Sequence, residues 1–194
     1  MNLLNLAIRR ASIREFDPNK PPSLDKVLYC IRVALEAPSG LNCQPWRFLI
    51  IRDINTKRSI RGICENGEKN FYANIPSKFR EWLTKRNFSW RKPFLTEAPY
   101  LLLVFSDISC PYFIQSTWLA IGYLLLALEE QGLSSLTYTP PNPNKISKFL
   151  NVPKRFRLEC IIPIGYKKRD KKKEPRANIS EKTYIEEWGK FHIT

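Results

Sequence analysis

Three polar residues near the start of the chain, Arg10, Ser12 and Arg14, alternate with apolar ones in the stretch RRASIREF. In an extended segment, such alternation places the three side chains on one face. Two guanidinium groups beside a hydroxyl suit a bound phosphate, because each guanidinium offers fork-shaped donors. The alternative is an exposed basic end of a helix, where arginines interact favourably with the helix dipole. This stretch by itself favours the alternative, since surface arginines are common.

A second candidate is the turn in APSGLNCQPWRFLII, which runs from Ala37 to Ile51. One bend just before an apolar run gathers Ser39, Gly40, Asn42 and Gln44. Loops that carry several polar groups on a rigid scaffold are frequent binding sites. Taken singly, Ser39 and Asn42 are better explained as structural residues that satisfy backbone groups at the end of a helix.

A third candidate is the basic run from Lys167 to Lys173, which only Asp170 interrupts. The chain has a net charge of +14, so an anionic partner is expected: nucleic acid, an acidic surface or a phosphorylated small molecule. A solvated loop is the default for such a run, and nucleic-acid binding is the alternative. No aromatic residue interleaves with the charges after Tyr166, so base stacking is unsupported. Arg176, just past Pro175, is placed to close on a phosphate held elsewhere.

Several chemistries are excluded by what the sequence lacks. The single histidine, His192, is third from the end, which argues against a Ser-His-Asp triad, a Cys-His pair and an HExxH zinc site. The seven glycines form neither a GxGxxG motif nor a P-loop, so no dinucleotide or nucleotide-phosphate loop is indicated. We expect no metal site. If the protein is an enzyme, a bound cofactor therefore carries the reaction.

The chain has five cysteines, namely Cys30, Cys43, Cys64, Cys110 and Cys160. They are widely spaced, odd in number and form no CxxC pair, so the sequence indicates neither a zinc site nor a disulfide framework. We interpret them as reduced thiols of a cytoplasmic protein. The N-terminus has no signal-peptide pattern. The most apolar stretch, Trp118 to Leu128, is shorter than the roughly 20 residues that span a bilayer, so no membrane association is expected.

The elements that must position these residues follow from hydrophobic periodicity. We predict helices at 2–10, 21–37, 56–67, 113–132 and 142–151, and strands at 47–53, 100–107, 133–139 and 157–166. Ser23 is expected to cap the second helix. The helix at 113–132 is apolar nearly all round, which is typical of a core or a subunit interface. Alternating strands and helices ordinarily suggest a parallel sheet, but the uneven connections fit an α+β sandwich with a mainly antiparallel sheet at least as well.

Taken together, four segments resemble the FMN-dependent nitroreductase superfamily. RRASIREFDP is similar to its N-terminal phosphate motif, APSGLNCQPWRFLII to its second block, GLSSLTYTP to its third and IIPIGYKKRDKKKEPR to its closing segment. The blocks occur in the family's order over nearly the whole chain. The resemblance implies an α+β fold, a three-layer sandwich with helices flanking a mainly antiparallel central sheet. It also implies an intertwined homodimer with two FMN sites at the interface.

The resemblance further implies which residues contact the cofactor. The expected FMN-binding residues are Arg10, Ala11, Ser12, Ile13, Arg14, Pro38, Ser39, Gly40, Asn42, Thr137, Tyr138, Thr139 and Arg176. The three arginines among them and Ser12 would bind the phosphate and the ribityl chain. Thr139 matches the catalytic threonine that meets the flavin N5 atom, an arrangement that favours one-electron steps.

Within the superfamily, the iodotyrosine deiodinase branch fits best. Its lid uses a Glu, a Tyr and a Lys, which here match Glu68, Tyr72 and Lys92 in EKNFY and WRKPFLTEAP. Residues four apart share a helix face, so Glu68 and Tyr72 would point together into a pocket. Glu68 would take the ammonium of a zwitterionic amino acid, and Lys92 and Tyr72 its carboxylate. Leu41 completes the expected substrate-binding set; without the resemblance, the lid residues would be an ordinary surface triad.

Three functions are therefore weighed. The first is an FMN-dependent oxidoreductase that reduces a small aromatic substrate, by reductive dehalogenation of a halogenated tyrosine. The second is a general nitro- or quinone reductase that uses NAD(P)H, and the third, which the sequence disfavours, is a basic nucleic-acid-binding module without catalysis. Residues 1–194 would form one FMN-binding domain with a lid at about 66–95 and a C-terminal extension at about 177–194. The electron donor, NAD(P)H or another reductant, stays open.

Overall fold

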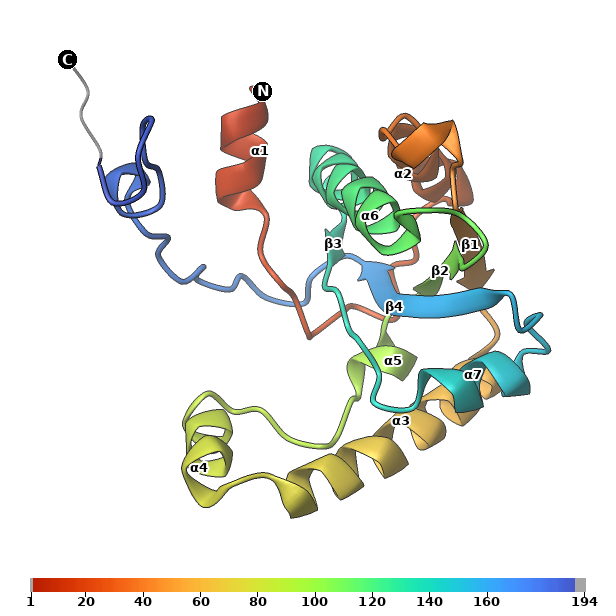
Figure 1. Ribbon diagram of the computed structural model, residues 1–194. Helices are drawn as coiled ribbons and strands as arrows, with labels where there is room; N and C mark the ends of the chain where they lie inside the picture. The colour runs from red at the N-terminus through yellow and green to blue at the C-terminus, as the bar shows by residue number, and fades with distance from the viewer. Residues whose placement is uncertain (1, 191–194) are drawn as a thin grey trace.

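A four-stranded sheet in the order β1–β2–β4–β3 forms the centre of the molecule, and its neighbouring strands are antiparallel (Figure 1). The computed structural model describes residues 2–190, so His192 lies outside the described residues. The strands are β1 (Trp46–Ile51), β2 (Tyr100–Asp107), β3 (Ser134–Ser135) and β4 (Phe156–Gly165). The helices are α1 (Leu3–Arg9), α2 (Leu24–Leu35), α3 (Ile54–Asn74), α4 (Ser77–Lys85), α5 (Phe94–Glu97), α6 (Phe113–Glu130) and α7 (Pro143–Phe149), with short 3₁₀ turns η1 (Gly40–Asn42) and η2 (Ile179–Glu181).

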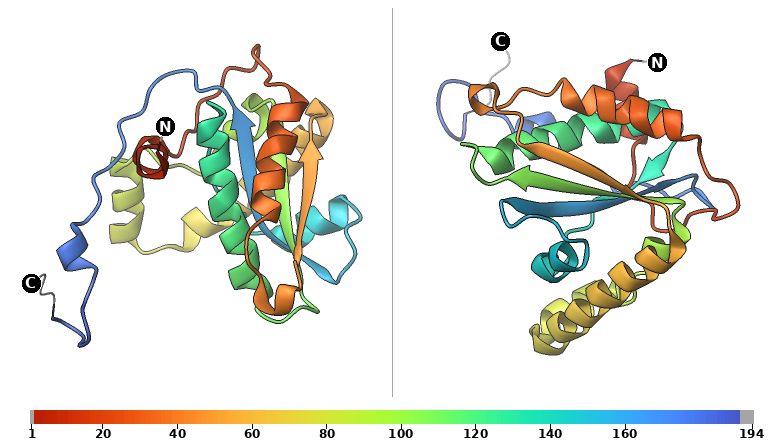
Figure 2. Two further views of the ribbon diagram at one scale, coloured as in Figure 1. Left: turned by 90° about the horizontal axis from the view of Figure 1, so that it is seen from above. Right: turned by 90° about the vertical axis from the view of Figure 1, so that its right-hand side faces the viewer.

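Helices cover both faces of the sheet (Figure 2). Every residue of β2 is buried, because its alternate side chains enter two separate cores. Leu102 and Val104 pack in the core that α2 and α6 cover, whereas Leu101 and Leu103 pack in the core beneath α3, α5 and α7. The predicted three-layer α+β sandwich with a mainly antiparallel sheet is therefore confirmed.

The strand predicted at 133–139 is regular only at Ser134–Ser135. Its register nevertheless continues, because Ser135 pairs with Ile164 and Tyr138 pairs with Ile161. In that register Leu136 faces Pro163 of β4, which has no backbone N–H to donate. The proline thus interrupts the ladder without moving the chain away from the sheet.

Helix α6 buries one face against the sheet and α2 and leaves apolar side chains on the other. Ala120 and Leu124 are fully buried, while Leu119 is 49% exposed. Further exposed apolar side chains on α6 and α1 are Ile114, Trp118, Tyr123, Leu3, Leu4 and Ile8. This uncovered apolar face agrees with the sequence-based expectation of a core or interface helix. Ser23 is the N-cap of α2, as predicted, but its hydroxyl makes no capping hydrogen bond.

The predicted lid, residues 66–95, contains the C-terminal part of α3, all of α4 and the start of α5, and it projects from the sheet (Figure 1). Buried Lys57 joins the two chain segments from which the lid projects. The Lys57 ammonium donates to the carbonyl of Ala98 at 2.8 Å. Burial lowers the pKa of Lys57. The lysine therefore ties the start of α3 to the end of α5.

Candidate active site

The phosphate-motif segment lies beside β3. Helix α1 ends at Arg9, and the Ile13 N–H donates to the carbonyl of Ser135 at 3.0 Å. Ser12 forms a parallel bridge with Ser135. The Arg10 guanidinium lies 3.5 Å from the Ser12 hydroxyl. The segment is thus non-helical and pairs with the sheet, so the helix end that this stretch by itself favours is wrong for residues 11–14 and the extended alternative holds.

The basic run returns along the same segment. The Lys171 ammonium donates to the carbonyl of Ser12 at 3.4 Å, and the Lys173 ammonium donates to the carbonyl of Ala7 at 2.6 Å. The side chains of the run are largely exposed, as expected for a solvated loop. The two lysines nevertheless hold the run against the N-terminal segment.

Cations from these two segments lie close enough to repel one another. Burial lowers the pKa of Lys173, and nearby Arg176 and Arg10 lower it further. Burial likewise lowers the pKa of Lys171, with a smaller contribution from Arg14. Arg10 and Arg176, from opposite ends of the chain, thus act on one lysine. Such a cluster favours a bound anion, and a phosphate has the charge and the acceptor oxygens to satisfy it.

A cleft of about 680 Å³ opens between residues 13–15, the end of the lid and the basic run. This volume is typical of a small-molecule site. The lining contains six basic side chains, Arg14, Arg86, Arg91, Lys92, Arg169 and Lys171, and three acidic ones, Glu15, Asp170 and Glu174. The Arg14 guanidinium lies over the Phe88 ring, 4.8 Å from its centroid, and burial lowers the pKa of Arg14. The cleft therefore suits an anionic aromatic ligand.

The three lid residues predicted from the resemblance come together beside this cleft. The Lys92 ammonium lies 3.1 Å from Glu68 Oε2, and both side chains are largely buried. The same ammonium lies over the Tyr72 ring, 5.6 Å from its centroid. Burial raises the pKa of Tyr72, and the Glu68 carboxylate raises it further. The alternative of an ordinary surface triad does not fit this arrangement, because Glu68 is only 8% exposed.

Residues 137–139 run beside β4, and their side chains point alternately to its two sides. The backbone N–H and carbonyl of Tyr138 pair with Ile161 at 2.9 and 2.8 Å. Thr139 is exposed and Thr137 half-buried, whereas Tyr138 points inward, where its hydroxyl donates to Glu68 Oε1 at 2.8 Å. The side chain of Tyr138 therefore faces the opposite side of the segment from the side chains of Thr137 and Thr139. Sequence reasoning missed this contact, because the alternation of the three residues predicts only that Tyr138 faces away from the two threonines and does not identify its partner.

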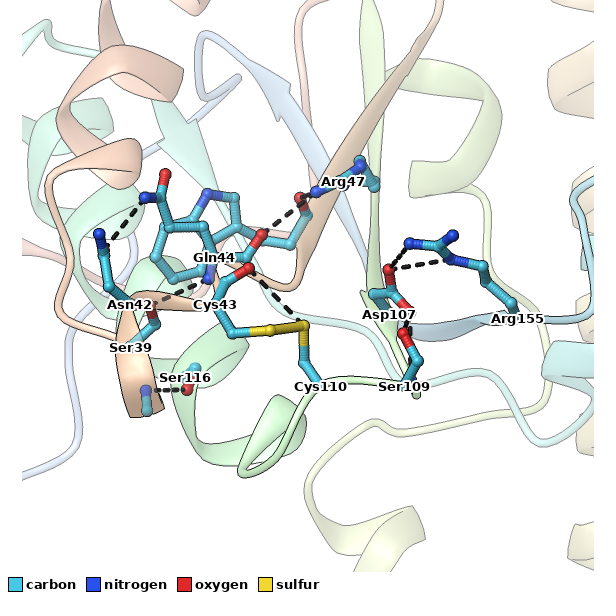
Figure 3. Close-up of a disulfide and its surroundings, with 12 residues drawn as sticks. Ser39, Asn42, Cys43, Gln44, Arg47, Asp107, Ser109, Cys110, Ser116 and Arg155 are labelled. Carbon is cyan, nitrogen blue, oxygen red and sulfur yellow. Dashed lines mark hydrogen bonds and ion pairs between the residues drawn. A yellow bond between two sulfur atoms is a disulfide. The ribbon is translucent and has the colours of Figure 1, made fainter.

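The turn before β1 is held by its own polar groups. The Ser39 hydroxyl accepts from the Gln44 N–H at 3.0 Å, and the Gly40 N–H donates to the Ser116 hydroxyl of α6 at 3.2 Å (Figure 3). The Asn42 side-chain oxygen accepts from the Gln44 amide at 3.0 Å. Ser39 thus satisfies a backbone group, as its structural interpretation predicts, whereas Asn42 bonds to a side chain, and binding of FMN by these two residues stays a prediction.

Cys43, in this turn, is joined by a disulfide to Cys110 in the loop between β2 and α6 (Figure 3). The prediction that all cysteines are reduced thiols is wrong for this pair. The two cysteines are 67 residues apart, and the pairing of β1 with β2 brings them together, which spacing alone does not reveal. The other three cysteines are free and buried.

The turn does not join the cleft within one chain. It packs against the start of α6, and none of its residues lines the cleft. Its tip, Leu41, is 86% exposed. Two groups of predicted cofactor ligands, residues 38–42 and residues 10–14, therefore lie on separate surfaces of the chain.

Two further sequence expectations concern absences. Within residues 2–190, no group of three or more His, Cys, Asp or Glu side chains is arranged to hold a metal ion. In the same described part of the chain, no helix has the length and apolar character needed to cross a membrane.

Residues 7–166 match the nitroreductase family. The chain belongs to that family. This nitroreductase-family chain is 53% identical to the iodotyrosine deiodinase of Thermotoga neapolitana, over 91% of its own length and 95% of that protein's. It is 34% identical to the iodotyrosine deiodinase of Haliscomenobacter hydrossis, with 81% and 75% of the two chains covered.

The fold is also similar to a crystal structure of an oxidised iodotyrosine deiodinase bound to FMN and 3-iodo-L-tyrosine. The TM-score is 0.89 at 50% sequence identity, and the match covers 98% of this chain and all of that one. The resemblance that the four sequence segments indicate, including the deiodinase branch of the nitroreductase family, is thereby confirmed.

Proposed function

We propose that this protein is an FMN-dependent oxidoreductase that removes the halogen from a halogenated tyrosine. The grouping of Glu68 and Tyr72 around Lys92, which lines a cationic cleft, carries the proposal. The similarity to iodotyrosine deiodinases supports it. In the overall reaction, two electrons and one proton convert a carbon–halogen bond to a carbon–hydrogen bond and release halide.

The cluster of like charges supports FMN as the cofactor. Arg10, Ser12 and Arg176 would bind its phosphate, and the phosphate charge would offset the repulsion of Arg10 and Arg176 with Lys173. Thr139, whose side chain is exposed beside β4, would donate its hydroxyl to the flavin ring. FMN supplies the electrons of the reaction, and the protein binds it, orients the substrate and limits access of water.

The ion pair between Glu68 and Lys92 suits the main-chain groups of an amino acid. The substrate ammonium would bind Glu68, and its carboxylate would bind Lys92 and the Tyr72 hydroxyl. When the substrate binds, Glu68 and Lys92 thus exchange each other for the substrate's charged groups, and both charges remain paired. An unpaired charge would be costly there, because the two side chains are only 10% and 12% exposed. An aromatic compound without these groups would leave the pair unused.

A homodimer would bring the separated ligand groups together. The exposed apolar side chains of α6 and α1, with Leu41 at the tip of the turn, support an interface there. The turn of one protomer would then reach the cofactor held by the cleft of its partner. Size-exclusion chromatography with light scattering tests this proposal, and a monomer at all concentrations would refute it.

We also propose that the chain forms one domain with a lid and a C-terminal extension. Residues 1–194 would form one FMN-binding domain, residues 66–95 would close over the substrate as a lid, and residues 177–194 would form a C-terminal extension, of which residues 191–194 lie outside the described residues. Exposed aromatic side chains on the lid, such as Phe79 and Trp82, are suited to this closing movement.

Cytoplasmic location remains a further proposal, as does NAD(P)H, or another reductant, as the electron donor. Disulfides are rare in cytosolic proteins outside hyperthermophiles, so the state of the Cys43–Cys110 bond in the cell bears directly on this location. Alkylation of free thiols in quenched cells, followed by mass spectrometry, reports whether this bond exists there.

One experiment tests the main proposal. The purified protein should be yellow, with the absorbance of oxidised flavin, and 3-iodo-L-tyrosine should perturb that spectrum at micromolar concentration. Chemically reduced protein should release iodide from 3-iodo-L-tyrosine. A colourless protein that binds nucleic acid would overturn the assignment, and turnover of nitroaromatics without iodotyrosine binding would favour the general reductase.

A further inference from the structure

The Tyr138 side chain connects the segment beside β4 to the lid. Its hydroxyl donates to Glu68 Oε1 at 2.8 Å, while Lys92 pairs with the other carboxylate oxygen at 3.1 Å. The Lys92 ammonium also lies 5.8 Å from the centroid of the Tyr138 ring. Each oxygen of Glu68 thus has a different partner, and Tyr138 contacts the lid pair from the core.

Tyr138 is held rigidly. Its backbone forms two hydrogen bonds with Ile161, and its ring packs edge-on against Phe94 with centroids 5.5 Å apart. The side chain is 8% exposed. Burial raises the pKa of Tyr138 far above its ordinary value, so the phenol stays protonated and donates to Glu68 at any physiological pH.

The helix that carries Glu68 is seated against the residues that follow Tyr138. A Cβ on the preceding residue, Gly67, would lie 2.4 Å from the Asn142 side-chain amide. Buried Cys64, one turn before Glu68, also interacts with the phenol. The middle of α3 therefore takes its position from the chain segment that contains Thr139.

We propose that Tyr138 is a positioning residue that holds the Glu68 carboxylate for the ammonium group of an amino-acid substrate. This inference rests on the proposed function. When the substrate carboxylate draws Lys92 away, the phenol remains as the fixed partner of Glu68 and keeps one carboxylate oxygen directed to the substrate. Because Tyr138 precedes Thr139, the same segment sets the distance between the bound ammonium group and the flavin.

The test compares two ligands in two variants. Tyr138→Phe removes only the hydroxyl, and Tyr100→Phe is the matched control, since buried Tyr100 donates to the carbonyl of Pro22 at 3.0 Å, away from the lid. The ligands are 3-iodo-L-tyrosine and 2-iodo-4-methylphenol, which lacks the ammonium and carboxylate. Flavin absorbance or fluorescence gives both dissociation constants.

Tyr138→Phe should reduce the preference for iodotyrosine over the iodophenol about tenfold or more, because a hydrogen bond to a charged group is lost. Tyr100→Phe should keep the preference. In steady-state turnover of iodotyrosine, Tyr138→Phe should raise KM more than it lowers kcat. An unchanged preference in Tyr138→Phe would overturn the inference, while wild-type protein that binds no iodotyrosine would instead refute the proposed function.

A double-substitution cycle tests whether Tyr138 acts through Glu68, and thermal unfolding separates a lost contact from a loss of folding. In a Glu68→Gln background, Tyr138→Phe should weaken iodotyrosine binding by much less than in the wild-type background, because the two residues act through one contact. Thermal unfolding of all variants identifies those that fold. If the two substitutions have independent effects on affinity, the inference is wrong. If Tyr138→Phe is unfolded at the assay temperature, the titrations of all variants are made at a lower temperature at which it is folded, and the same outcomes decide.

Discussion

Gly67 of α3 lies so close to Pro141 that a Cβ on the glycine would be 2.8 Å from the proline ring. Gly67→Ala should therefore push α3 away from the segment after Thr139. We expect it to lower the free energy of unfolding by about 1–3 kcal/mol, as overpacking does, and to weaken binding of 3-iodo-L-tyrosine. Urea unfolding and a flavin titration measure the two effects.

Gly62 is the matched control on the same helix. A Cβ there has no neighbouring atom within 4 Å. Gly62→Ala should raise the free energy of unfolding by up to about 1 kcal/mol, because alanine is the better helix former. Equal effects of the two substitutions would show that the contact at Gly67 is not tight.

The ion pair of Glu68 and Lys92 gives a second prediction. Lys92→Met should weaken 3-iodo-L-tyrosine binding tenfold or more, because the substrate carboxylate loses its cation and Glu68 loses its partner. Lys78→Met, in the exposed part of α4, changes the charge of the lid equally and should leave affinity near the wild-type value. Equal losses in both variants would indicate only long-range attraction.

The Cys43–Cys110 disulfide predicts a redox-dependent stability. It closes a loop of 67 residues, for which restriction of the unfolded chain is worth about 4 kcal/mol. Tm should fall when a strong reductant is added, and a Cys43→Ser, Cys110→Ser variant should show the lower Tm in both conditions. Differential scanning calorimetry measures this, and a Tm of the wild-type protein that is insensitive to reductant would contradict it.

The pair of Asp107 and Arg155 predicts a pH dependence. The hydrogen bond from the Arg155 guanidinium holds the pKa of Asp107 well below its ordinary value, and Ser109 adds to the effect. A lowered folded-state pKa stabilises the fold above the unfolded value, about 3.9. This stabilisation is lost as the pH falls through the folded-state pKa.

Arg155→Gln should therefore destabilise the protein most above about pH 5 and progressively less as the pH falls below about 4. Urea unfolding at pH 7 and pH 3 gives the comparison, with Lys154→Gln as the neighbouring control of equal charge change. A difference between wild type and Arg155→Gln that grows toward pH 3 would contradict the assignment.

The central elements were predictable because each is an apolar run bounded by turn residues. The apolar run at 100–107 is β2, and the helix predicted at 113–132 is α6, two residues shorter. The strand at 133–139 was predicted too long, since local patterning does not show that Pro163 stands opposite Leu136.

The site was less accessible to sequence reasoning. Composition and spacing singled out Arg10, Ser12 and Arg14, whereas Glu68 and Lys92 were found only through the family resemblance. The contact of Tyr138 with Glu68 depends on the docking of α3 against the segment that contains Tyr138 and Pro141, and no local pattern encodes it. Long-range pairings of this kind come from the tertiary fold.

The separation of the turn at residues 38–42 from the cleft has a genetic consequence in the proposed homodimer. Chains damaged only at the turn and chains damaged only at the cleft would each be inactive alone. When both are made in one cell, a mixed pair would assemble one damaged site from the two faulty halves and one intact site from the two sound halves. Two such alleles would therefore complement each other.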